Sequence, residues 1–218
     1  GMPKMVRQAG KAMHLGCGFG LGSQDKYIAV AKTMAQIVVT PEEAAEHIAG
    51  YRRKHPEIVQ GWKTCHSALD AIAVGAEQPI DPWEMCWTCA EGIRTPRGMI
   101  RYPNLRKERN EEGKAEWFYG EGRHKARIYA GKVDENIVQH LARTALVGYD
   151  LEFSRTKVGR NLPLALEVYD ELVYIVPEDE AEEALDTLQG IMRSPLPWWP
   201  ELVTWSEGGI ADRYGEAK

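Results

Sequence analysis

Residues 164–177 read LALEVYDELVYIVP. Two short apolar runs separated by polar residues predict an antiparallel hairpin, and Asp170 and Glu171 lie at its tip. We expect both strands to be buried, so a charged pair between them is costly unless it meets cations, a metal or hydrogen-bond donors. Such carboxylates suit Mg²⁺, which takes one or two of them per site together with phosphate oxygens and water. The alternative is a solvent-exposed turn.

Composition places the chain among ordinary globular proteins. Its 218 residues are 44% hydrophobic and 27% charged, with a formal net charge of -5. This excludes a disordered or collagen-like chain, and the length accommodates one or two domains. Because no apolar run approaches the roughly 18 residues of a membrane helix and no signal peptide is evident, we expect no membrane partner and a cytoplasmic location.

The pattern of elements predicts an α+β fold. We expect a helical region over residues 1–100, and an antiparallel sheet with packing helices over residues 101–218, centred on the hairpin at 164–176. The expected helices cover Met5–Leu15, Ile28–Val38, Ala44–Arg53, Glu57–Val74, Val133–Tyr149 and Ala181–Met192. Thr40 and Pro41 are typical of a helix start. Short strands are expected within 76–100, and a strand pair within Trp117–Tyr129.

A basic pair marks the first expected helix. Arg7 and Lys11 are four residues apart and therefore share one face. A guanidinium fork and an ammonium one turn apart form a cradle for a triphosphate. Phe19 follows between Gly18 and Gly20, which lets a base approach closely.

Residues 101–127 mix eight Lys or Arg side chains with four aromatic rings. Such a stretch suits a phosphate backbone, and the competing interpretation is a solvated surface hairpin.

Four cysteines allow a second kind of site. Cys65-His66 and Cys86-x2-Cys89 offer a Cys3His set for zinc. Adjacent ligands are hard to aim at one tetrahedral ion, so we favour free thiols.

Two of these motifs, in their order along the chain, resemble signatures of the DNA polymerase I family (family A). Arg7-x3-Lys11-x7-Phe19-Gly20 resembles the nucleotide-binding helix of the fingers, usually R-x3-K-x7-Y-G. Val168-Tyr169-Asp170-Glu171-Leu172-Val173 resembles the palm hairpin, usually written H-D-E. Further segments resemble phage-type members, so the resemblance covers nearly the whole chain: 51–62, 97–105, 128–139 and 197–218.

The resemblance implies a role for each matching residue. The incoming deoxynucleoside triphosphate would be bound by Arg7, Lys11, Leu15 and Phe19. Lys11 would also donate a proton to the pyrophosphate leaving group. Asp170 would be the catalytic, Mg²⁺-binding carboxylate, with Glu171 as its weaker companion. The DNA primer-template would be contacted by Gln139, Arg143 and Tyr169.

One family motif is missing from the sequence. The other palm aspartate, in an Asp-Tyr/Phe-Ser-x-Ile/Leu-Glu pattern, does not occur, nor do the thumb and exonuclease segments. The resemblance therefore implies a C-terminal fingers-plus-palm portion, with 1–100 as fingers and 101–218 as palm, in the host cytoplasm if phage-encoded. We expect it to need an N-terminal polymerase portion, supplied by a separate partner or by the rest of a longer chain, that carries this aspartate, and to be inactive alone. The alternative is a non-catalytic DNA-binding or assembly module that keeps the fold.

Overall fold

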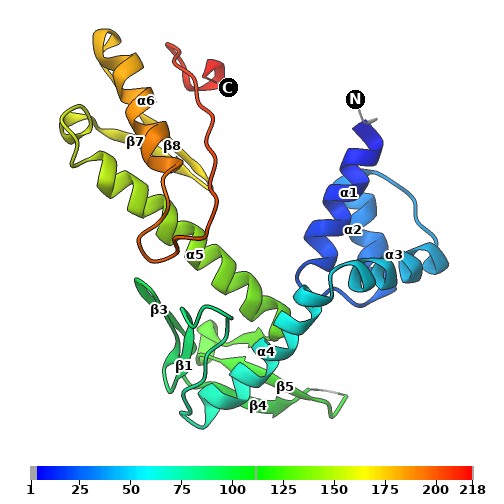
Figure 1. Ribbon diagram of the computed structural model, residues 1–218. Coiled ribbons are helices and arrows are strands. Elements are labelled where there is room, and N and C mark those ends of the chain that lie inside the picture. Colours follow the sequence, from blue (N-terminus) through cyan, green and yellow to red (C-terminus); the bar gives the residue numbers. More distant parts are fainter. Residues whose placement is uncertain (1–3, 111, 218) are drawn as a thin grey trace. The chain divides into compact units, whose positions relative to one another are not determined.

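The computed structural model describes residues 4–110 and 112–217. These residues form α-helices and three small antiparallel sheets, which confirms the predicted α+β class (Figure 1). The chain divides into two compact units, and the division falls between residues 138 and 139, inside a long helix. The expected fingers and palm regions, divided near residue 100, stay a prediction.

Four α-helices open the first unit: α1 (Lys4–Cys17), α2 (Gln24–Val30), α3 (Pro41–Lys54) and α4 (Pro56–Ala73). The predicted start of α3 is confirmed, because Thr40 accepts from the Glu43 backbone N–H while the Glu43 carboxylate accepts from that of Thr40. The helix expected over 28–38 differs. α2 passes into a π-helical segment, Ala31–Ala35, which ends where Gln36 takes a left-handed φ of 57°.

The core of these helices is built by side chains one helical turn apart. Ile48 and Tyr51 of α3 are buried against Tyr27 of α2 and Cys17 of α1. Half-buried Trp62 of α4 packs on the same cluster. This cluster fixes α1 and α4 in one unit.

Two three-stranded sheets complete the first unit. β1 (Trp87–Cys89), β2 (Gly92–Thr95) and β3 (Gly98–Arg101) pair in that order, as do β4 (Arg106–Arg109), β5 (Ala115–Tyr119) and β6 (Ala126–Ile128). The strand pair predicted within Trp117–Tyr129 is confirmed by Trp117 lying opposite Ile128.

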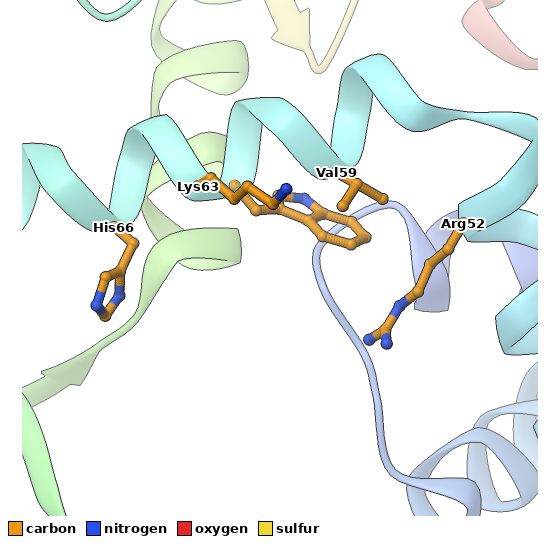
Figure 2. A pocket seen from close by; sticks show the side chains of 5 residues that line it. Arg52, Val59, Lys63 and His66 are labelled. Carbon is orange, nitrogen blue, oxygen red and sulfur yellow. The ribbon is translucent and has the colours of Figure 1, made fainter.

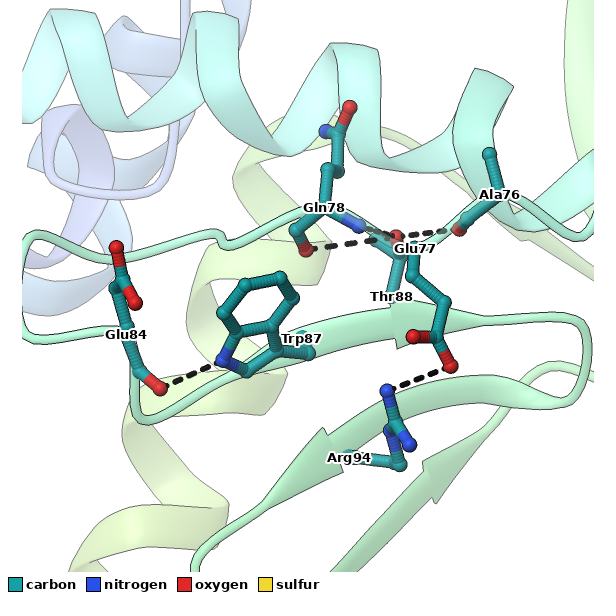
Figure 3. A network of polar contacts seen from close by, with 7 residues as sticks. All are labelled: Ala76, Glu77, Gln78, Glu84, Trp87, Thr88 and Arg94. Carbon is teal, nitrogen blue, oxygen red and sulfur yellow. Dashed lines mark hydrogen bonds and ion pairs between the residues drawn. The ribbon is translucent and has the colours of Figure 1, made fainter.

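A polar network closes the segment between α4 and the first sheet (Figure 3). The fully buried Thr88 hydroxyl donates to the Ala76 carbonyl over 2.8 Å and accepts from the Gln78 backbone N–H over 3.0 Å. Arg94 pairs with Glu77 at 2.7 Å. The buried Thr88 hydroxyl therefore both donates and accepts a hydrogen bond, which ties residues 76–78 to β1.

The second unit contains the rest of α5 (Ala130–Phe153), then β7 (Leu164–Val168), β8 (Glu171–Tyr174) and α6 (Ala181–Met192). The predicted hairpin and the predicted bounds of α6 are confirmed. Leu172, Tyr174 and Val176 pack against a cluster that includes Tyr149, Phe153 and Leu188. Alternate residues of β8 thus face this core, as strand geometry requires.

Two expectations for the hairpin are wrong. β7 is not buried, since Leu164, Ala165 and Leu166 are exposed. The hairpin is also not at the centre of a larger sheet, because among the described residues β7 and β8 pair only with each other. The physical reason is that helices cover one face of β8 alone, which leaves β7 with an apolar surface and an open edge.

Candidate functional site

The predicted triphosphate cradle lies on a solvent-facing row of α1. Arg7, Lys11 and Leu15 follow at intervals of four residues, and all three are exposed, Leu15 to 44%. No ion pair among the described residues engages Arg7 or Lys11. The Arg7 guanidinium and the Lys11 ammonium thus lie on one helical face without an ion-pair partner and are available to an anionic ligand.

Phe19 sits in the turn that ends α1. Trp62 of α4 donates its indole N–H to the Gly18 carbonyl over 3.1 Å. On the other side, a Cβ built on Gly131 of α5 would lie only 2.0 Å from the Phe19 carbonyl oxygen. Gly20 takes a φ of 81°, which glycine adopts at little cost. The turn that carries Phe19 is therefore clamped between α4 and α5.

The hairpin tip is a two-residue turn that contains Asp170 but not Glu171. Glu171 is the first residue of β8 and lies opposite Val168, so only Tyr169 and Asp170 form the turn. Tyr169 has a φ of 54° and is 96% exposed. Asp170 is also exposed, and among the described residues no hydrogen bond or ion pair engages its carboxylate. Asp170 therefore presents both oxygens to solvent.

Glu171 differs from Asp170 in having a hydrogen-bond partner. Tyr214 of the C-terminal tail donates its hydroxyl to Glu171 Oε2 over 2.7 Å. This hydrogen bond raises the pKa of Tyr214, because the carboxylate stabilises the protonated phenol. The contact therefore engages one oxygen of Glu171, whereas the Asp170 carboxylate is exposed.

The sequence predicts two kinds of metal site, a zinc site at the cysteines and a Mg²⁺ site at the hairpin tip. The part of the chain that the structure describes holds no group of three or more His, Cys, Asp or Glu side chains that suits an ion. Burial raises the pKa of Cys65 and of Cys86 to about 12. The choice between a zinc site and free thiols stays a prediction. His66 is exposed on α4. The binding of Mg²⁺ by Asp170 and Glu171 stays a prediction.

The predicted DNA contacts Gln139 and Arg143 share one exposed face of α5, four residues apart. Arg143 pairs with Glu167 of β7 within the second unit. A DNA phosphate that binds Arg143 would therefore have to displace the Glu167 carboxylate or share the guanidinium with it.

The basic stretch at 101–127 is largely neutralised. Five of its eight cations pair with carboxylates: Arg101 with Glu91, Arg106 and Lys125 with Glu108, Lys107 with Asp70, and Arg127 with Glu116. Lys107 also lies 4.6 Å from the Trp117 ring centre. These contacts favour a solvated surface hairpin over a surface that binds a nucleic-acid phosphate backbone.

Sequence reasoning missed a groove of about 410 Å³ on the first unit (Figure 2). It is lined by Arg52 of α3 and by Val59, Trp62, Lys63 and His66 of α4. The α4 residues follow at intervals of three and four, the spacing of a single helical face. That spacing was the available signal, but an amphipathic core face shows it too.

Arg7, Lys11, Leu15 and Phe19 belong to the first unit, whereas Tyr169, Asp170 and Glu171 belong to the second. Their convergence in one cleft stays a prediction. Comparisons with family models, curated proteins and solved structures return no match to this chain.

Proposed function

We propose that this chain is the fingers-and-palm portion of a template-directed DNA polymerase of the DNA polymerase I family. One observation carries the proposal. Two chemically complementary features occur in the family's order along the chain, an exposed Arg7 and Lys11 pair on α1 and an exposed, unpaired Asp170 at a hairpin tip.

The residues of α1 act on the incoming deoxynucleoside triphosphate. Arg7 binds phosphate oxygens through its planar fork, and Lys11 contributes a compact charge. Lys11 also donates a proton to the pyrophosphate as it leaves. Leu15 lies beside the sugar and Phe19 beside the new base pair. Phosphoryl transfer needs this positioning and charge neutralisation more than covalent chemistry.

The hairpin supplies the carboxylates. Asp170, with Glu171 as companion, would hold Mg²⁺, and the bound ion would neutralise phosphate charge and lower the pKa of the primer 3′-hydroxyl. Tyr169, Gln139 and Arg143 contact the primer-template. An N-terminal polymerase portion adds the second aspartate, because two metals need more carboxylates than this tip provides.

Complementation tests the proposal. The chain is mixed with a polypeptide that carries the missing palm strand and thumb, and Mg²⁺-dependent extension of a primer-template is measured. We expect extension only in the mixture. Asp170→Ala should abolish it with little change in DNA affinity, whereas Asp179→Ala, the same change at an exposed position in 178–180, should retain it. Lys11→Ala should slow incorporation about 10²-fold if general acid catalysis is lost.

The second candidate function is a non-catalytic DNA-binding module that keeps the fold, and it is favoured by the missing palm aspartate motif in the sequence. DNA binding without extension in the mixture would support that function and contradict the polymerase proposal.

A further inference from the structure

A second groove lies at the base of the β7–β8 hairpin, at the end away from the Asp170 tip. Two segments line it, 157–163 before β7 and 175–180 after β8, and its volume is about 580 Å³. The Ile175 backbone N–H donates to the Pro163 carbonyl over 3.2 Å, which joins the two segments. This hairpin-base groove lies wholly within the second unit.

The lining of the hairpin-base groove is largely apolar. Val158, Leu162 and Val176 line it while they pack on the core of the second unit. Ile175 is 66% exposed, because its neighbours Tyr174 and Val176 pack on that core and adjacent residues of an extended segment point to opposite sides. Covering a side chain of this kind with a partner removes apolar surface from water and stabilises the contact.

Opposite charges border the groove. Lys157 belongs to the first segment and Glu180 to the second, and both residues are exposed. Neither of them forms an ion pair with any other residue that the structure describes. Arg155 and Arg160 flank Lys157 in the sequence, and residues 178–179 add two acids before Glu180. The groove therefore has a basic side and an acidic side.

We infer that the hairpin-base groove is the contact surface of a homodimer, in which a second copy of this chain docks about a two-fold axis along the groove. Such an axis places the basic side of one copy over the acidic side of the other, so Lys157 of each copy faces Glu180 of the second copy. The same rotation brings the two Ile175 side chains together over the apolar lining. An apolar centre with one sign of charge on each side is complementary to itself, which identifies the second copy as the occupant.

Sedimentation velocity of the chain alone tests the inference at concentrations from about 1 to about 300 μM, because an interface of this size forms a weak dimer. We expect a monomer–dimer equilibrium that salt weakens. Lys157→Glu and Glu180→Lys should each raise the dimer Kd about tenfold or more, since the dimer contains the charge pair twice. An equal mixture of the two variants should regain the original affinity, because both contacts then join opposite charges again.

Ile175→Asp should abolish the dimer. Ile210→Asp is the matched control, the same change at a 53% exposed position of the second unit outside the groove lining, and it should leave the Kd unchanged. A chain that stays monomeric up to the highest concentration would overturn the inference. So would equal effects of the two isoleucine changes, or a mixture of the charge variants that associates no better than either variant alone. The assay contains no DNA, nucleotide or Mg²⁺, so its outcome is independent of the proposed function.

Discussion

Gly131→Ala tests whether the start of α5 packs directly against the backbone of the turn that carries Phe19. An added Cβ would lie 2.0 Å from the Phe19 carbonyl oxygen and 2.6 Å from its carbon, whereas real Cβ contacts essentially never fall below 3.0 Å. Both neighbours are backbone atoms, so no side chain can swing aside. Either the turn or the first residues of α5 must move by about 1 Å.

Overpacking of this kind costs about 1 to 3 kcal/mol. A chain of this size loses about 2 to 4 °C of Tm for each kcal/mol. We therefore expect Gly131→Ala to lower the midpoint by roughly 2 to 12 °C in a thermal scan followed by circular dichroism.

Gly61→Ala is the matched control in the same unit. Gly61 lies inside α4, and a Cβ there meets nothing within 4 Å. Because alanine favours a helix over glycine, this variant should gain about 0.5 to 1 kcal/mol. A Tm for Gly131→Ala at or above that of the unaltered chain would refute the clamped turn, and so would an equal loss in both variants.

Two further predictions follow from burial. Burial raises the pKa of Asp134 above its ordinary 3.8, so the folded chain binds the carboxyl proton more tightly than the unfolded chain does. The free energy of unfolding therefore falls as the pH rises from about 4 through the raised pKa. Asp134→Asn should therefore stabilise the chain at pH 7 in urea denaturation, and a gain that persists at pH 3 would contradict this. Of the four thiols only half-buried Cys89 should react rapidly with a disulfide reagent. Cys89→Ser should abolish the fast phase, and a remaining fast thiol would show the burial to be wrong.

Local chemistry made several elements predictable. The Thr40-Pro41 helix start carries its own hydrogen-bond partners in sequence, and Thr40 is the N-cap of α3 as predicted. The hairpin at 164–176 likewise followed from two apolar runs around a polar tip. Each of these signals needs only neighbours a few residues away.

Features that depend on distant partners escaped prediction. An apolar run shows that β7 can be buried but not what covers it, so the exposure of Leu164 and Leu166 was missed. The π-helical segment after α2 has no distinct composition. The groove around Trp62 needs Arg52 from a second helix, and the spacing along α4 alone does not reveal that neighbour.

The central claim is that α1 and the hairpin tip serve one reaction, and proximity tests it most directly. Lys11→Cys and Tyr169→Cys are combined in a Cys89→Ser background and assembled with the N-terminal portion, primer-template and nucleotide. A short bismaleimide should then join the two positions within one chain, as mass spectrometry of the linked peptides would show. Single adducts at each cysteine, with no peptide pair joining 11 to 169, would contradict a shared nucleotidyl-transfer site.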